Sequence, residues 1–354
     1  MKVEIADPRT DPEPEGWPVF RSRMRLHPVW DYRLLRLEAW TARNPPVLAV
    51  VRADDGRVIG GLSVMVCRSW NDQSYAPARY ARRTRLRPRW AEVYLPLLSG
   101  YPACVLDGDA GVRREAIRCF ERELVRFLGT GLLGVMYRAM TLELADAMSG
   151  PARMRRQIDP TAVLAGVESE QDWRAAVAPR VRQMLDEFAA DPGVRSTAGA
   201  ARDDLDASEL AALLNAHRAR QDERAWAGGQ RSRIGGLHMD TRSPVSAAYL
   251  DELVHRKDIV TRTYTTPGGR LLGFNTMIDH PRSAAVHHWA AVPRAEGGRP
   301  DLYVDAYAHC VRQMLERRSG ELTAGRAMLG EKAALGFGTR DLFTVAAPRP
   351  VLGR

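Results

Sequence analysis

One order of predicted helices and strands occurs twice in this sequence, and the repeat restricts the fold more than any other feature. In the first half, a helical stretch at residues 29–42 precedes VLAVVRADDGRVIGGLSVMVC, which begins at Val47 and predicts two strands joined by a turn at Asp54-Asp55-Gly56. In the second half, a helical stretch at residues 245–256 precedes IVTRTYTTPGGRLLGFNTMID, which predicts two strands around Pro267-Gly268-Gly269. The segments GRVIG and GRLLG align at the two turns.

The parallel continues downstream of the hairpins. Residues 112–128 have apolar side chains at helical spacing and lead into the strand-like LLGVMY, and residues 301–318 in the same way lead into GELTAG. Arg-Ala-Met and a further short helix follow in both halves. A chance match of common patterns is the alternative, but the shared order of helix, hairpin, strand, helix, strand and helix favours an α/β protein with a duplicated unit.

The length of 354 residues allows two domains, each with its own core. We expect an N-terminal domain at residues 1–150, a crossover segment at residues 151–172 that is polar and mixed, and a C-terminal domain at residues 173–354. The C-terminal domain is expected to open with an amphipathic helix at residues 173–190, which ends at Asp191-Pro192-Gly193 because proline and glycine stop helices.

The composition is typical of a globular protein, with 45% hydrophobic and 27% charged residues. No apolar run approaches the roughly 20 residues that span a bilayer, and residues 1–18 are acidic and proline-rich without an apolar secretion signal. We therefore expect a cytoplasmic protein. Cys67, Cys104, Cys119 and Cys310 occur singly in apolar or amphipathic segments, which predicts buried thiols and no metal site.

The net charge of +9 permits an anionic partner such as RNA or a phosphorylated co-substrate. Arginine greatly outnumbers lysine, a skew that a GC-rich genome also produces. Two arginine clusters nevertheless surround aromatic residues, an arrangement that suits phosphate contacts and base stacking. They consist of Arg79, Arg82, Arg83, Arg85, Arg87 and Arg89 around Tyr80 and Trp90, and of Arg218, Arg220, Arg224, Arg231 and Arg233 around Trp226.

The segment LYVDAYAHCVRQMLERRSGELTAGRAMLGEKAALGF, residues 302–337, resembles the closing part of the tandem-GNAT acyltransferases, and residues 173–193 resemble the entry to their second domain. This superfamily includes the Fem-type aminoacyl-tRNA-dependent transferases and bacterial GNAT-fold N-acyltransferases. The resemblance implies two GNAT-like domains, each with a mixed central sheet flanked by helices. It also implies an active site in the second domain and either aminoacyl-tRNA or acyl-CoA as co-substrate, with no tightly bound cofactor.

Two segments depart from the family pattern. Enzymes that use acyl-CoA bind its pyrophosphate with a glycine-rich loop at a helix N-terminus. The corresponding loops here are residues 107–111 in the first half and residues 294–299 in the second, and both contain acidic residues and have a different glycine spacing. The basic residues of the loop in the second half are Arg294 and Arg299. The helix predicted at residues 173–190 carries Asp186 and Glu187 beside its arginines, which weakens an RNA-binding role there.

The first catalytic candidate is Lys332, because the family resemblance places a lysine there to hold a substrate anion or the charge of the transition state. A solvated helix lysine is the alternative. His287 and His288 lie on a predicted strand, so one should face the core and the other the opposite side, and either could accept the proton of an attacking amine. A structural, hydrogen-bonded histidine is the alternative for both. Asp305 is the fourth candidate, to orient the amine.

Six further residues are predicted to contact substrate: Arg326, Glu331, Tyr303, Tyr307, Trp289 and Asn275. The tyrosines fall on the apolar stripe of their helix and Trp289 on a strand, so core packing is their alternative role.

Together these features favour an N-acyltransferase that forms an amide with a small-molecule or peptide amine, with aminoacyl-tRNA slightly favoured over acyl-CoA as donor. A non-catalytic GNAT-like protein that binds anions is the rival hypothesis. The sequence leaves the acceptor and the oligomeric state open.

Overall fold

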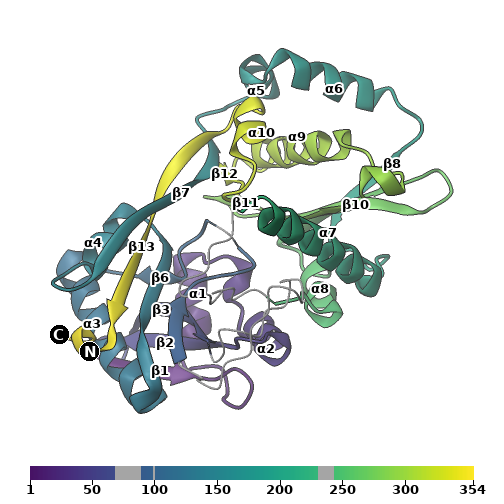
Figure 1. Ribbon diagram of the computed structural model, residues 1–354. Helices are drawn as coiled ribbons and strands as arrows, with labels where there is room; N and C mark the ends of the chain where they lie inside the picture. Colours follow the sequence, from purple (N-terminus) through teal and green to yellow (C-terminus); the bar gives the residue numbers. More distant parts are fainter. Residues whose placement is uncertain (68–88, 99, 230–242) are drawn as a thin grey trace. The chain divides into compact units, whose positions relative to one another are not determined.

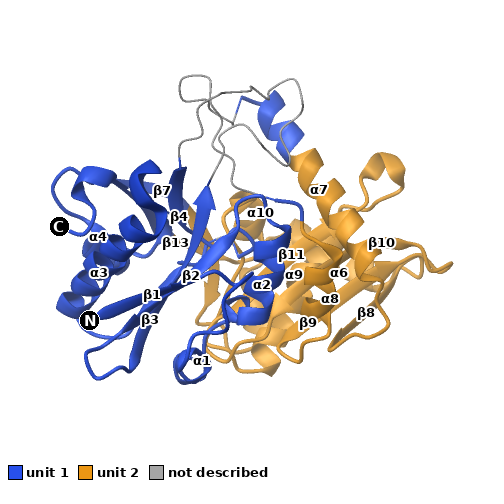
Figure 2. Ribbon diagram, turned by 90° about the horizontal axis from the view of Figure 1, so that it is seen from below, with its two compact units in different colours: residues 1–159, 222–244, 341–354 blue, residues 160–221, 245–340 orange. Residues whose placement is uncertain are grey.

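The computed structural model describes residues 1–67, 89–98, 100–229 and 243–354 (Figure 1). The chain forms two compact units (Figure 2). Unit 1 comprises Met1–Asp159, Asp222–Pro244 and Asp341–Arg354, and unit 2 comprises Pro160–Gln221 and Val245–Arg340.

Unit 1 contains a sheet with the strand order β1-β2-β3-β4-β6-β13, and β5 also pairs with β3. Only β4 and β6 run parallel to each other among the neighbouring pairs whose register is described. The strands are β1 (Lys2–Ala6), β2 (Pro46–Arg52), β3 (Val58–Cys67), β4 (Arg89–Val93), β5 (Cys104–Leu106), β6 (Leu132–Met140) and β13 (Gly338–Pro348). The helices are α1 (Trp17–Met24), α2 (Tyr32–Thr41), α3 (Ala110–Leu128) and α4 (Leu142–Met148).

Unit 2 contains a sheet with the strand order β7-β12-β11-β10-β9-β8, in which only β11 and β12 are parallel. The strands are β7 (Met154–Ala165), β8 (Arg195–Ala200), β9 (Ile259–Thr265), β10 (Leu271–Ile278), β11 (Ala284–Ala291) and β12 (Glu321–Thr323). The helices are α5 (Glu170–Ala176), α6 (Pro179–Ala189), α7 (Ala207–Ala227, of which residues 222–227 are counted in unit 1), α8 (Ala247–Val254), α9 (Asp301–Glu316) and α10 (Leu329–Ala334). Helices α6 and α9 lie on one side of this sheet, and α7 and α8 on the other (Figure 1).

The repeat predicted from the sequence is confirmed. Helix α2 and the hairpin β2–β3 correspond to α8 and β9–β10, and α3, β6 and α4 correspond to α9, β12 and α10. Gly56 and Gly269 close the two hairpins with nearly equal φ angles of 85° and 86°, a left-handed conformation that favours glycine. The mixed sheets flanked by helices are those expected of the predicted fold class.

The unit boundaries differ from the predicted domain ranges because the two halves exchange strands. The segment predicted as a polar crossover contains β7, whose residues Val163–Ala165 pair with β12 in unit 2. At the other end of the chain, Phe343–Pro348 of β13 pair with β6 in unit 1. Each sheet is thus completed by a strand from the other half of the sequence.

The helix predicted at residues 173–190 is divided into α5 and α6. Val177 and Ala178 have extended backbone angles, and Pro179 occupies the first turn of α6, where its missing N–H costs nothing. Trp173 is completely buried, and its indole N–H donates to the carbonyl of Leu335 at 2.8 Å. The break therefore lets α5 pack against the end of α10 while α6 packs on α9.

The prediction of buried thiols is confirmed for three cysteines and wrong for the fourth. Cys67, Cys104 and Cys310 are buried, whereas Cys119 is partly exposed on α3 and contacts Glu115 and Arg122. None of the described helices combines the length and the apolar character needed to cross a membrane.

Candidate functional site

The parallel strands β11 and β12 of unit 2 separate soon after they begin. They pair only at Ala284–Leu322 and Ala285–Thr323, while β11 continues to Ala291. The edge of β11 from Val286 onward is therefore not hydrogen-bonded to β12. A strand edge of this kind directs backbone N–H and C=O groups toward whatever lies beside it.

A bulge in β11 places the two adjacent histidines on the same face of the sheet. The register changes from Asn275–Trp289 to Met277–Val286, so that His287 and His288 both lie opposite Thr276. Their rings stack with centroids 3.9 Å apart, and the backbone N–H of His288 donates to the Thr276 hydroxyl at 3.0 Å. The predicted alternation, with one histidine on each face, is wrong because the extra residue of the bulge interrupts the period of two.

His288 is buried between β11 and the helices α7 and α8. Its side chain is 1% exposed, and its Nδ1 lies 3.4 Å from Nη2 of Arg218 on α7. The ring of Tyr249 on α8 meets it edge-on, with centroids 6.4 Å apart. Burial, with smaller contributions from His287 and Arg218, holds the pKa of His288 well below its usual value, so the imidazole is neutral. His287 as a whole is partly exposed, but both nitrogens of its ring are buried.

The opposite face of β11 carries a row of aromatic rings that continues onto α9. Trp289 contacts Tyr303 with centroids 5.6 Å apart, Tyr303 contacts Tyr307 at 4.5 Å, and Tyr307 contacts Phe337 at 5.9 Å. Tyr307 and Phe337 are buried, whereas Trp289 and Tyr303 are partly exposed residues, although the Tyr303 hydroxyl oxygen is buried. Burial raises the pKa of Tyr303 to about 12, so this phenol remains protonated at neutral pH.

Lys332 on α10 is buried, with only 3% of the residue exposed, and it binds the loop that follows β12. Its ammonium group donates hydrogen bonds to the carbonyls of Ala324, Gly325 and Ala327, and lies 5.8 Å from the ring centre of Tyr307. Burial lowers its pKa to about 8, against an opposing effect of Glu331. These hydrogen bonds use the N–H groups of the ammonium with which Lys332 would otherwise bind a substrate anion. Arg326 is partly exposed and Glu331 is exposed beside this loop.

Asp305 and Asn275 lie in a buried polar group between the sheet and α9. The Asp305 carboxylate accepts from Arg262 at 2.7 Å and from the Tyr264 hydroxyl at 2.8 Å. Burial and Asp305 raise the pKa of Tyr264 well above its usual value. The Asn275 amide donates to Sγ of Cys310 at 3.2 Å. The carboxylate predicted to orient an amine is therefore already paired with a guanidinium.

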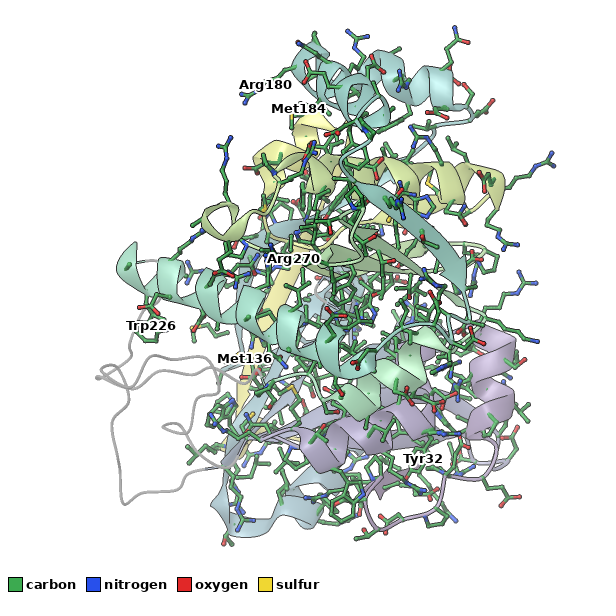
Figure 3. The ribbon with its side chains drawn as sticks, turned by 90° about the vertical axis from the view of Figure 1, so that its right-hand side faces the viewer. Tyr32, Met136, Arg180, Met184, Trp226 and Arg270 are labelled. Carbon is green, nitrogen blue, oxygen red and sulfur yellow. The ribbon has the colours of Figure 1, made fainter. Side chains whose placement is uncertain are left out.

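The loop before α9 is closed on itself where a GNAT enzyme would bind pyrophosphate. The N–H groups of Glu296 and Gly298 both donate to the Pro293 carbonyl, and that of Gly297 donates to Arg294. A Cβ at position 298 would lie 1.8 Å from the Val292 carbonyl oxygen, so only glycine fits. Arg270 also holds this loop, through a 2.7 Å hydrogen bond to the Glu296 carbonyl (Figure 3).

Arg299, at the end of this loop, forms ion pairs with Asp191 and Asp301, and the hydrogen bond to Asp301 contributes most to raising its pKa. An open cavity of about 540 Å³ lies beside it and is lined by residues of the loop and of α6, among them Met184, which Figure 3 labels. Its lining residues are Met184, Glu187, Asp191, Arg294, Gly298, Arg299, Pro300 and Asp301. Three carboxylates against two guanidiniums make this cavity a poor environment for a pyrophosphate.

No family model and no curated protein matches this chain, but solved structures match its fold. FemX is 9% identical and covers 98% of this chain and 97% of its own, with a TM-score of 0.57. L-PGS from Bacillus licheniformis is 10% identical, covers 97% and 93%, and has a TM-score of 0.53. A tandem GNAT protein from the clavulanic acid biosynthesis pathway is 14% identical, covers 98% and 99%, and has a TM-score of 0.51.

The chain has a tandem GNAT fold. The resemblance predicted from the sequence is thereby confirmed at the level of architecture. In this tandem GNAT fold, β11 and β12 are the pair of central strands that separate, and α9 is the helix that follows the phosphate-loop position. The corresponding helix of the first GNAT unit, α3, is N-capped by Asp109, whose carboxylate accepts from the N–H of Val112 at 2.9 Å. Both helix N-termini thus already have an acidic side chain beside them.

The arginine clusters lie only partly within the described residues. Arg79, Arg82, Arg83, Arg85, Arg87, Arg231 and Arg233 lie outside them. Arg89 and Arg224 are exposed. Arg218 and Arg220 of α7 instead contact β11 of the second GNAT unit, since Arg220 donates to the Ala291 carbonyl at 2.9 Å and Arg218 contacts His288.

Sequence reasoning missed three residues that contact the candidate site residues. Arg262 and Tyr264 bind Asp305, and His217 of α7 has its Nδ1 3.4 Å from the backbone N and O of Ala291. The signal for Arg262 was present, because a charged residue within the apolar strand pattern IVTRTYT requires a buried partner. His217 carries no comparable signal, since it lies beside the charged stretch 218–224 of α7, where a polar side chain is ordinary.

Proposed function

We propose that the protein is an N-acyltransferase that forms an amide bond at the open edge of β11 in unit 2. The main support for this proposal is that β11 extends six residues beyond its last pair with β12, from Val286 to Ala291. Val292 N–H donates to Leu272 on the β10 side. Along an antiparallel strand, successive residues point their backbone N–H and C=O groups alternately to one side and to the other. Trp289 and Ala291 therefore direct their N–H and C=O groups toward the open edge.

This edge offers the groups that acyl transfer requires. The N–H of Trp289 is placed to donate to a carbonyl oxygen as negative charge develops on it, a stabilisation that commonly contributes several kcal/mol. Ala291 is held by Arg220, which keeps α7 against the strand. The electron pair of a neutral amine attacks the acyl carbon, the C–N bond forms, and the C–O bond of an ester donor breaks. The amine nitrogen loses one proton, and the leaving oxygen of the donor gains one.

Aminoacyl-tRNA fits this chain better than acyl-CoA. The pyrophosphate of CoA would require free N–H groups and positive charge at the start of α9, where Glu296, Gly297 and Gly298 use their N–H groups within the loop and Arg299 is paired with two aspartates. The net charge of +9, the exposed Arg89 and Arg224, and the resemblance to Fem-type transferases support an RNA-linked donor. Such a donor places the reaction in the cytoplasm.

The proposal is tested by incubating the purified protein with mixed amines and either aminoacylated tRNA or acetyl-CoA. We expect amide products from the tRNA mixture, and their loss after RNase treatment. If about six phosphates are contacted, tRNA affinity should fall roughly 10³-fold between 50 and 200 mM salt. Products that form from acetyl-CoA and survive RNase would overturn the choice of donor.

A non-catalytic anion-binding protein is the second candidate, because Lys332 and Asp305 are both occupied by partners within the protein. A non-catalytic protein of this kind should bind tRNA with the same salt dependence as the proposed enzyme, but it should form no amide product from any donor.

A further inference from the structure

Two arginines of unit 1 lie on either side of the start of β6. Strand β4 begins at Arg89, which pairs with Leu132 of β6, and β13 ends at Pro348, which pairs with Gly134 on the other side of β6. Arg349 directly follows Pro348. Since neighbouring strands are about 4.8 Å apart, the backbones of β4 and β13 are roughly 10 Å apart across β6, a gap that two arginine side chains can span.

Both arginine side chains contact the turn that joins α3 to β6. Nη1 of Arg89 lies 3.5 Å from the carbonyl oxygen of Leu128, and Nη1 of Arg349 donates to the carbonyl of Thr130. A Cβ added to Gly131 would lie 3.8 Å from Nε of Arg89, so the Arg89 side chain extends along the turn. The two guanidiniums are thus held on one turn by neutral carbonyl groups.

The positive charge of these two arginines is not balanced nearby. Within the part of the chain that the structure describes, neither of them forms an ion pair. The segments that form the turn and its neighbours, residues 124–136 and 343–352, contain Arg126 and Arg349 but no aspartate or glutamate. Arg126 pairs with Glu123 at 2.9 Å and therefore adds no net charge. Two like charges on one turn repel each other, and an anion bound between them would remove this repulsion.

Exposed apolar side chains precede and follow the same turn. Phe127, near the end of α3, is 45% exposed, and Leu133, near the start of β6, is 50% exposed. An exposed aromatic ring beside arginines suits single-stranded nucleic acid, whose phosphates bind guanidiniums and whose bases stack on rings. A membrane surface fits less well, because binding in the membrane interface depends on a large continuous apolar face.

We propose that Arg89, Arg349 and Phe127 form an RNA-binding site on unit 1, in which the guanidiniums contact phosphates and the Phe127 ring stacks on an unpaired base. This inference rests on the proposed function, since it gives the RNA of the donor a contact on unit 1. Phosphate contacts and base stacking carry little sequence information, so the site should accept many RNA sequences.

The test is a titration of the full chain with deacylated mixed tRNA at several salt concentrations. We expect Arg89→Gln and Arg349→Gln each to lower the slope of log affinity against log salt by about 1, and the double variant to lower it by about 2. Each single variant should bind roughly 5- to 10-fold more weakly at about 0.1 M salt. Phe127→Ala should lower the affinity roughly 5- to 100-fold without changing the slope, because stacking releases no counterions.

Three control variants separate the site from general effects of substitution. Arg349→Lys keeps the charge and should keep the wild-type slope. Arg126→Gln removes a neighbouring arginine that is already paired, and Trp40→Ala removes a ring that is 65% exposed on α2 of the same unit. Both should bind tRNA as the wild type does. Thermal denaturation of every variant reports whether it is folded.

A folded double variant that binds tRNA with the wild-type affinity and slope would overturn the proposal. Loss of binding to phosphatidylglycerol vesicles in the same variants, with tRNA binding unchanged, would also overturn it, because the occupant would then be a membrane surface. If the wild type forms amides from aminoacyl-tRNA but the double variant binds tRNA normally, the site is refuted and the proposed function stands. If tRNA binding depends on these residues but the wild type forms no amide from any donor, the site stands and the proposed function is refuted.

Discussion

The Lys332 ammonium group donates to the carbonyl of Ala327 at 2.6 Å, so that the cation of α10 closes the loop joining β12 to its own helix. Two further carbonyls of the same loop, those of Ala324 and Gly325, converge on it. This loop forms the end of β12, the strand from which β11 separates. We expect Lys332 to act by fixing the loop, and its effects on stability are testable without knowledge of the substrate.

Lys332 should make stability rise with pH. Its folded-state pKa of about 8 lies below its ordinary value of 10.5, so between these values the unfolded chain binds more protons, and the free energy of unfolding increases as pH rises through that window. The full gain is about 3 kcal/mol at most. Urea denaturation of wild type and Lys332→Met from pH 7 to 9.5 measures it. The variant should lose the rise, and the exposed Lys257→Met should keep it. Parallel curves for wild type and Lys332→Met would contradict the assignment.

Glu121 should be essential to the stability of unit 1. Its buried carboxylate accepts from Arg153 at 2.6 and 2.7 Å, from Tyr137 at 2.8 Å and from the N–H of Gly353 at 2.8 Å. Glu121→Gln leaves Arg153 without its counter-charge, so we expect a loss of about 3–5 kcal/mol in unfolding free energy. The partly exposed Glu123→Gln on the same helix should change it by less than about 0.5 kcal/mol. If Glu121→Gln and Glu123→Gln both lowered the free energy of unfolding by the same small amount, the ion pair between Glu121 and Arg153 would contribute little to stability.

Gly298→Ala should disrupt the closed loop before α9. The added methyl group would lie 1.8 Å from the Val292 carbonyl oxygen, and the backbone on both sides must move to relieve the overlap. We expect the free energy of unfolding to fall by about 1–3 kcal/mol, the cost that overpacking commonly has, and the melting temperature to fall with it. Gly330→Ala is the matched control, because nothing lies within 4 Å of its Cβ and alanine favours the helix. A melting temperature equal to that of wild type would show that the loop is not held as described.

Arg224→Gln should weaken tRNA binding through charge alone. The residue is exposed near the end of α7, and removal of one phosphate contact lowers the slope of log affinity against log salt by about 1. Binding titrations at several salt concentrations measure this slope. Arg126→Gln, also exposed but on α3 and paired with Glu123, should leave it unchanged. Identical slopes for Arg224→Gln and wild type would exclude a phosphate contact at this position.

Local features of the fold were predictable because a few neighbouring residues encode them. The glycines at 56 and 269 specify their hairpin turns, and the apolar spacing in residues 112–128 and 301–318 specifies α3 and α9. The acidic character of the two phosphate-loop segments was also visible, and Asp109 and Asp301 do lie at the helix N-termini.

The tertiary structure alone decided which strands exchange and what each candidate side chain contacts. The pairing of β13 with β6 joins residues about 200 positions apart, and the contact between Arg218 and His288 spans 70 positions. The bulge that places His287 beside His288 depends on the register between β10 and β11, which no period within β11 reveals. Turns and periodicity arise from the conformational preferences of adjacent residues, whereas strand partners, burial and protonation arise from interactions that exist only once distant segments have met.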